Sequence, residues 1–118
     1  MSTLRANSIE HTDGGPIAMV KQDPSKSWLR SSAAATISDS FNTSSSSDQG
    51  TGNYDYTFTN NMTNTVYSIT CNGSYAEIAE PENTTASTSK YTIRIFGRQD
   101  SLNTQDQVHS SQICGELA

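Results

Sequence analysis

The chain has 118 residues and a net charge of −5, and it is poor in both apolar and charged residues. Hydrophobic residues make up 32 %, below the ~45–50 % (Gly included) usual for soluble domains, and 34 of the 118 residues are Ser or Thr. This length predicts one domain with a modest core. The acidic charge argues against nucleic acid as a partner, because phosphate neutralisation requires basic residues.

No segment has the apolar length that a membrane span or an export signal requires. A spanning helix needs about 18 or more consecutive apolar residues, and no such run occurs. Residues 1–10 lack the basic start and apolar stretch of a secretory leader, so we expect synthesis into the cytoplasm. Cys71 and Cys114 are too few for a disulfide framework, and we expect reduced thiols rather than a disulfide.

The N-terminal segment, residues 1–15, is predicted to be an extended anchoring arm. After Met1 its only large apolar residues are Leu4 and Ile9, and it runs into a turn or hinge pattern at Asp13-Gly14-Gly15-Pro16. A segment this polar cannot hold itself folded, so it is either disordered or packed on another chain. Leu4 and Ile9 are therefore the candidate assembly residues, and residues 16–118 are assigned to a β-domain.

Short strand signals follow in close order. Residues 17–20 form an apolar run typical of a buried strand, and residues 26–31 predict a second strand in which we expect Trp28 in the core. Four apolar residues of one parity are expected to share a face: Ala33, Ala35, Ile37 and Phe41. The Ser- and Gly-rich residues 43–52 predict a hairpin with a glycine turn, with disorder as the alternative for residues 43–48.

The clearest strands come later. Tyr54, Tyr56 and Phe58 alternate with polar residues, which predicts a half-buried strand with these rings in the core. The same alternation occurs in two further sets: Tyr67, Ile69 and Cys71, and Tyr91, Ile93 and Ile95. Val108 and Ile113 indicate a last strand, but their parities differ, so we expect a bulge there or a misplaced strand. No helical periodicity occurs, and strands at this spacing predict an all-β, small antiparallel β-sandwich or jelly-roll-like domain.

Residues that could carry chemistry do not form a convincing site. His11, His109, Cys71 and Cys114 lack the close-spaced pairs of a zinc site, and any Ser-His-Asp match is uninformative among so many serines. A cluster of Glu77, Glu80 and Glu82 could bind a divalent cation, but we expect a solvated loop. Tyr54 and Tyr56 could form a platform for sugar stacking, but beside Phe58 we expect them in the core. We expect no enzymatic activity, metal or cofactor.

The order of several motifs resembles a domain of marine bacteriophage (cyanophage-like) tail-fibre-like virion proteins. The segment from Lys26 to Ser68 is the firmest part of the likeness, and the opening Ser2–Ile9 is similar to the starts of such proteins. The motifs that carry it are Lys26 and Trp28, Ser40-Phe41-Asn42, Asp48, Gly50-Thr51-Gly52, Tyr54, Phe58-Thr59, Tyr67-Ser68 and Phe96-Gly97. The chain departs from the pattern at Thr43 and Ser46, where apolar residues are common, which weakens the predicted strand before the hairpin.

The resemblance implies a structural role in a virion, assembled in the host cytoplasm. The first hypothesis is a tail-fibre-like appendage component that serves particle assembly and host attachment. We expect a homotrimer, held to other virion proteins of tail or capsid by the arm and touching a host cell-surface receptor. The alternative is a capsid-surface decoration or knob protein, because so short a chain is not expected to build a long fibre. A small hydrolase is the third hypothesis. Nucleic acid and membrane insertion are not expected.

Overall fold

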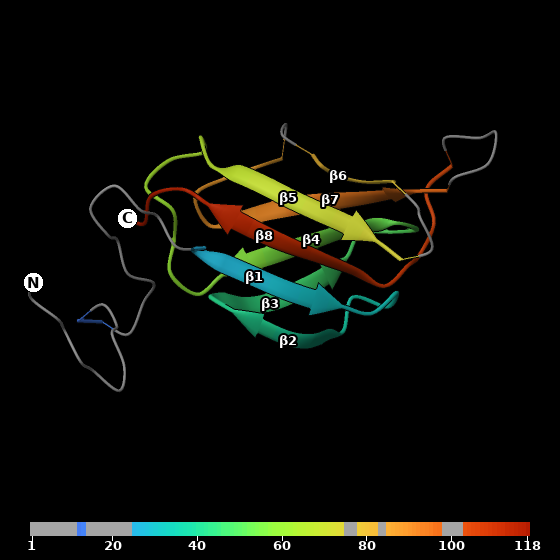
Figure 1. The fold of residues 1–118 in the computed structure, drawn as a ribbon, viewed down its shortest axis with the longest axis horizontal. Helices are drawn as coiled ribbons and strands as arrows, with labels where there is room; N and C mark the ends of the chain where they lie inside the picture. The colour runs from blue at the N-terminus through green and yellow to red at the C-terminus, as the bar shows by residue number, and fades with distance from the viewer. Residues whose placement is uncertain (1–11, 14–24, 75–77, 83–84, 98–102) are drawn as a thin grey trace, which may run out of the picture.

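The fold was obtained as a computed structural model, which describes residues 12–13, 25–74, 78–82, 85–97 and 103–118. These residues form eight antiparallel strands in two four-stranded sheets, packed as a β-sandwich (Figure 1). The predicted all-β sandwich is therefore confirmed. Leu4, Ile9 and the expected strand at residues 17–20 lie outside the described residues, so the arm stays a prediction.

Each sheet is built from strands that are distant in the sequence. Sheet I, nearer the viewer in Figure 1, has the order β2–β1–β8–β5: β2 (Ile37–Phe41), β1 (Ser27–Ser31), β8 (His109–Cys114) and β5 (Ser68–Gly73). Sheet II has the order β3–β4–β7–β6: β3 (Thr43–Asp48), β4 (Asn53–Phe58), β7 (Lys90–Phe96) and β6 (Ile78–Pro81). Pairing of β1 with β8 joins the start of the described domain to its end.

A single residue, Asn42, makes the corner at which the chain passes from sheet I to sheet II. It adopts a left-handed conformation with φ of 56°, which Asn tolerates better than most residues. Its side-chain amide donates to the carbonyl oxygen of Lys26 (2.9 Å), and its Oδ1 accepts from the backbone N–H of Asn60 (2.7 Å). The corner is therefore fixed by bonds to both neighbouring segments.

The β3–β4 hairpin turns at the glycines that the sequence singled out. Gly50 has φ of 122° and Gly52 has φ of 65°, in the region that favours glycine. A Cβ atom on Gly52 would lie 2.6 Å from the backbone nitrogen of Gln105, so this position also requires the small residue for packing. Thr43–Asp48 is an ordered edge strand, and the alternative of disorder for this segment is wrong.

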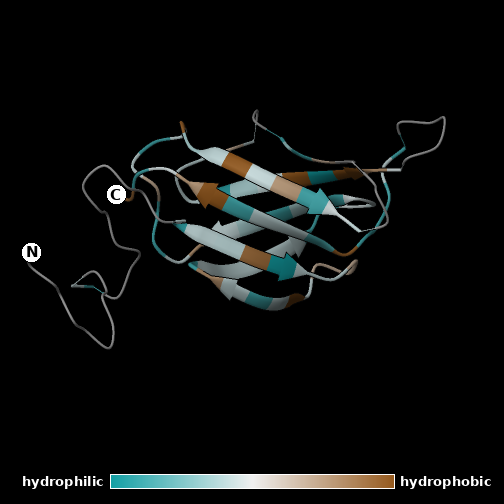
Figure 2. Cartoon of the chain, viewed as in Figure 1, coloured by the Kyte–Doolittle hydropathy of each residue, from teal (hydrophilic) through white to brown (hydrophobic). Residues whose placement is uncertain are grey.

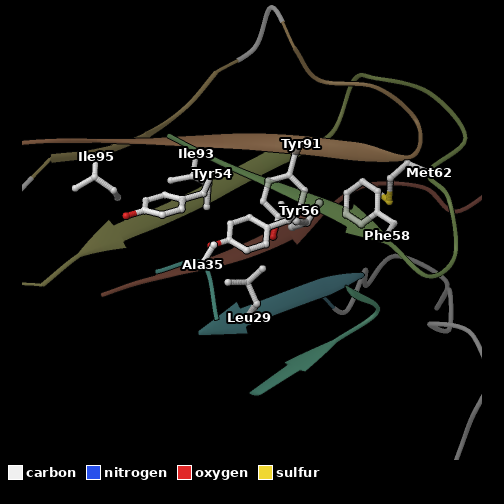
Figure 3. Packing of buried hydrophobic residues seen from close by; sticks show 10 residues of the cluster. Leu29, Ala35, Tyr54, Tyr56, Phe58, Met62, Tyr91, Ile93 and Ile95 are labelled. Carbon is white, nitrogen blue, oxygen red and sulfur yellow. The ribbon is translucent and has the colours of Figure 1, made fainter. Parts of the chain in front are cut away.

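Aromatic and aliphatic side chains of sheet II fill most of the space between the sheets (Figure 3). The strand predictions around Tyr54–Phe58 and Tyr91–Ile95 are confirmed, because all of their inward residues are buried. The buried hydrophobic residues are Leu29, Ala35, Tyr54, Tyr56, Phe58, Met62, Tyr91, Ile93, Ile95 and Ile113. Phe58, which the sequence predicts in the core with Tyr54 and Tyr56, is 3 % exposed.

The inward face of sheet I, which packs against these rings, carries several polar residues. Its inward positions include Ser31, His109 and Ser111, all buried. The hydroxyl of Tyr91 lies 2.8 Å from Ser111 Oγ, and the hydroxyl of Tyr56 lies 2.5 Å from His109 Nε2. A buried hydroxyl without a partner is costly. The serines and the histidine therefore allow tyrosine to serve as a core residue, which explains how a chain with few apolar residues closes a sandwich.

Two aromatic residues lie on the opposite face from the one predicted. Trp28 alternates with the buried Ser27 and Leu29 and is 39 % exposed, so its expected place in the core is wrong. Phe41 is also 39 % exposed and does not share the inward face of Ile37. For Phe41 the cause is a β-bulge in β2. Arg30 pairs with Asp39 but Ser31 pairs with Ile37, so Ser38 is an extra residue that reverses the parity between Ile37 and Phe41.

The last strand contains no bulge, because Val108 precedes it. β8 places His109, Ser111 and Ile113 inward, so the mismatch between Val108 and Ile113 arose from a misplaced strand. The two cysteines are free and lie on neighbouring strands. Cys114 pairs with Ser68 and Cys71 with Ser111, so the two thiols lie on opposite faces of sheet I and cannot bridge.

Candidate functional site

The outer face of sheet I is the surface on which exposed aromatic residues and neutral polar residues meet. Strand pairing arranges its outward side chains in two cross-strand rows. The first row, from β2 to β5, is Phe41, Trp28, Gln112 and Thr70, and the second row is Asp39, Arg30, Ser110 and Asn72. All eight are exposed except the half-buried Ser110. We call these eight residues the outer face.

The outer face is hollowed in its middle. A shallow depression of about 390 Å³ lies over β1, β8 and β5, with Trp28 and Arg30 on one side and Thr70 and Asn72 on the other. In Figure 2 hydrophobic and hydrophilic residues alternate along most of β5, as expected for a strand with one face turned out, whereas β8 is hydrophilic up to its last two residues. The volume lies within the ~300–1,000 Å³ typical of small-molecule sites.

One hydrogen bond within the outer face orders its polar groups. Ser110 Oγ donates to Asn72 Oδ1 at 2.5 Å. The acceptor oxygen of this amide is thereby used, while its NH₂ group keeps two donors. Arg30 stands directly opposite Asp39 on the neighbouring strand, so the second row carries one charge of each sign.

The outer side of sheet II is different, because its charged groups bind one another. Lys90 Nζ lies 2.8 Å from Asp55 Oδ2, and Thr92 Oγ1 donates to Asp55 Oδ1 at 2.6 Å. Arg94 lies 3.6 Å from Glu82 and over the ring of Phe96. Most of the charged groups on this side are therefore paired within sheet II, although Asn53 Oδ1 and Arg94 Nε are buried without a hydrogen-bond partner. The outer face of sheet I, with its exposed aromatic residues, is the better binding surface.

His109, the one histidine of the described part, belongs to the core. Its Nδ1 lies 2.7 Å from the carbonyl oxygen of Gln107, which can only accept, so the proton is assigned to Nδ1. Nε2 then accepts from the Tyr56 hydroxyl, and the ring lies against Tyr54 with centroids 4.4 Å apart. Burial lowers the pKa of His109 and raises that of Tyr56 to about 12. Both nitrogens are committed within the sandwich.

The other candidate residues do not converge. Glu80 is exposed on β6, Glu82 pairs with Arg94, and Glu77 and His11 lie outside the described residues. Within the described ranges, no three His, Cys, Asp or Glu side chains are grouped as a metal site would require. No helix long and apolar enough to cross a membrane occurs in that part of the chain. The predicted place of Tyr54 and Tyr56 in the core, rather than on a sugar platform, is confirmed.

The sequence did not identify the outer face. Trp28, Phe41, Gln112 and Asn72 come from four segments, and only the pairing of strands unites them. The run Ser27-Trp28-Leu29-Arg30-Ser31 fits either parity, since both an aromatic and an aliphatic residue are good core residues. The structure places Ser27, Leu29 and Ser31 inward, and the hydroxyls of the two serines donate to backbone carbonyl groups. Comparison of the chain with protein-family models, curated proteins and solved structures gave no match.

Proposed function

We propose that the chain is a non-enzymatic structural protein of a bacteriophage particle, a small tail-fibre-like appendage component that attaches to the host through the outer face. The observation that carries this proposal is the exposure of Trp28 and Phe41 together, as a cross-strand pair on one face of sheet I. Exposed aromatic residues beside neutral polar groups are typical of recognition surfaces. The resemblance in sequence supplies the virion context.

The motifs behind the resemblance have clear structural positions, which supports this use of them. Tyr54 and Phe58 are core residues, and Asn42 and Gly52 fix the corner and the hairpin. Trp28 and Phe41 belong to the same motifs but stabilise no core, since each is 39 % exposed. The same motifs therefore supply both core residues and exposed aromatic residues, as expected for a binding domain built on a β-sandwich.

The position of His109 bears on the hydrolase hypothesis. A general base must reach the proton that it removes, within hydrogen-bond distance of a substrate. His109 is 2 % exposed and both of its nitrogens are hydrogen-bonded inside the core. His109 is therefore a structural residue in this conformation and is not placed to act as the base of a Ser-His-Asp mechanism.

The proposal is tested on purified particles of the phage whose genome encodes the protein. Gold-labelled antibody against the purified protein should bind at the tail. Label on the head surface would instead support the capsid decoration alternative, and particles without label would overturn the virion role. Mass measurement of the purified protein should give the trimer that we propose.

Attachment is tested separately by competition. Host cells incubated with the purified protein should adsorb fewer particles, whereas Trp28→Ala protein should compete poorly. The control is Val66→Ala, which removes an 87 % exposed apolar side chain from a loop away from the outer face. Equal competition by both variants would contradict the assignment of attachment to this face.

A further inference from the structure

The charge of the outer face restricts what it can bind. Among its eight residues only Arg30 and Asp39 are charged, and strand pairing sets them opposite each other. Their fields cancel at a distance, so the face does not attract a strongly charged polymer. The chain as a whole has a net charge of −5, which further disfavours an acidic ligand. A neutral ligand fits this surface.

The polar groups of the outer face suit a ligand with many hydroxyls. Gln112 and Thr70 each carry donor and acceptor groups, Asn72 offers its NH₂ donors and Ser110 offers the acceptor lone pairs of its hydroxyl, and these four residues line the depression. The hydrogen bond from Ser110 Oγ to Asn72 Oδ1 orients the Asn72 amide, and the NH₂ group of that amide takes no part in this bond. Hydroxyl groups, which donate and accept in turn, match this set better than carboxylates or phosphates would.

The aromatic residue supplies the other half of a sugar site. Trp28 borders the depression and is 39 % exposed. A sugar ring has an apolar face of C–H groups and an edge of hydroxyls, so it can lie on an indole while its edge reaches neighbouring polar residues. Strands are ~4.8 Å apart and the two rows ~7 Å apart, from two residues of rise. These spacings are comparable to the width of one sugar ring.

We propose that the outer face binds a neutral saccharide, with one sugar ring on Trp28 and its hydroxyls bonded to Asn72 and Gln112. Phe41, the next residue of the first row, extends the aromatic surface towards β2 and provides a contact for a second ring. This inference rests on the proposed attachment function and names the class of its ligand. Several copies of one shallow site would give avidity in a trimer.

The test is binding of the full chain to an array of neutral oligosaccharides based on glucose, galactose and mannose, with sialylated and uronic acid glycans on the same surface. The protein should bind neutral glycans, and Trp28→Ala should bind them roughly tenfold or more weakly. Asn72→Ala should lose roughly threefold to tenfold in affinity. Val66→Ala is the matched control and should bind as the unsubstituted protein does.

Each contrary result has its own meaning. Binding to acidic glycans alone, to none, or equally by the Trp28→Ala and Val66→Ala proteins would overturn the saccharide proposal. A Trp28→Ala protein that changes from oligomer to monomer, with its β-sheet spectrum intact, would show an interface between copies and would overturn it too. If glycan binding fails while the unsubstituted protein still blocks adsorption, only the ligand class is wrong. If adsorption is also unaffected, the attachment function fails with it.

Discussion

Phe58 is a buried core residue that packs against two tyrosine rings. It is 3 % exposed, with ring centroids 5.3 Å from Tyr91 and 5.7 Å from Tyr67. Phe58→Ala should lower the free energy of unfolding by about 3–5 kcal/mol, through lost burial and a cavity. Urea unfolding followed by tyrosine fluorescence measures this change. Val66→Ala, the exposed control, should change it by less than about 0.5 kcal/mol; a similarly small effect of Phe58→Ala would contradict its core role.

His109 makes stability depend on pH. Burial lowers its pKa in the folded protein below the ordinary value of 6.5, whereas the unfolded chain keeps that ordinary value. The unfolded state therefore binds the proton first as pH falls, so stability is complete above pH 6.5 and is lost from there down to the folded pKa. The slope from this one group can reach about 1.4 kcal/mol per pH unit.

Urea unfolding between pH 5 and pH 7.5 tests this expectation, with His109→Gln as the comparison. The glutamine variant should be less stable at pH 7.5, because it loses fitted hydrogen bonds, but its stability should fall less steeply with acid. His11→Gln is the matched control and should keep the full slope. An unchanged slope in the His109→Gln protein would show that other groups cause the pH dependence.

At the scale of strands, the corner at Asn42 decides how the two sheets are joined. Asn42→Ala should cost about 2–4 kcal/mol, from left-handed strain at φ 56° and from unpaired backbone groups of Lys26 and Asn60. Asn42→Gly relieves the strain but not the lost bonds, so it should cost less, about 1–3 kcal/mol. Thermal unfolding of the two variants separates these contributions; equal losses would mean that the backbone conformation contributes nothing.

The reactivity of the two cysteines can distinguish the two faces of sheet I, because Cys71 points inward and Cys114 points outward. Cys114 is exposed, whereas Cys71 is half-buried and burial raises its pKa to about 11. A maleimide reagent at pH 8 should therefore label one thiol per chain in the folded protein and both thiols in urea. Mass spectrometry of Cys71→Ser protein should show unchanged native labelling, and Cys114→Ser should abolish it. A band shift on a non-reducing gel that indicates an intramolecular disulfide would contradict the opposite-face arrangement.

Alternation predicted those strands whose inward residues are apolar. Tyr54, Tyr56 and Phe58 on β4 and Tyr91, Ile93 and Ile95 on β7 are recognisable because large rings and aliphatic chains repeat every second residue. The opposing sheet is hidden from this method, since His109 and Ser111 face inward as partners of tyrosine hydroxyls. A hydrophobic pattern cannot identify a polar residue as inward.

The candidate site could not be predicted from the sequence for a different reason. Its members lie on β2, β1, β8 and β5, and their neighbourhood depends on register. The bulge at Ser38 turns Phe41 outward beside Trp28, and no local residue pattern predicts that bulge. Fold class was therefore predictable from composition and periodicity, whereas the binding surface required the pairing of strands.

On the scale of the whole molecule, hydrogen bonds replace part of the missing apolar core. Tyr54 donates to the carbonyl oxygen of Ala33 (2.9 Å), and the hydroxyl of Tyr67 donates to the carbonyl oxygen of Ser87 (2.9 Å). Such bonds specify the packing but add only about 0.5–1.5 kcal/mol each. A domain of this kind gains from partner chains, which is the physical reason to expect an oligomer.

The anchoring arm is the remaining large-scale prediction from sequence. Burial of Leu4 and Ile9 on a neighbouring chain supplies about 3–6 kcal/mol, and ordering a dozen residues costs more than this unless backbone bonds also form. An edge strand of a neighbour would provide such bonds. β3, an edge strand of sheet II whose side chains are mostly exposed, is a strand of this type. Attachment should therefore need the whole arm, including its backbone.

Deletion of residues 2–13 should leave a folded domain that no longer joins the particle. The described sandwich begins at β1, after the deleted segment, so circular dichroism and the urea midpoint should be close to those of the full chain. Particles grown with the deletion variant should contain at least tenfold less of it by quantitative mass spectrometry. Leu4→Ala with Ile9→Ala should give an intermediate loss, because the backbone of the arm remains. Incorporation of the deletion variant at normal copy number would show that the sandwich itself carries the attachment surface.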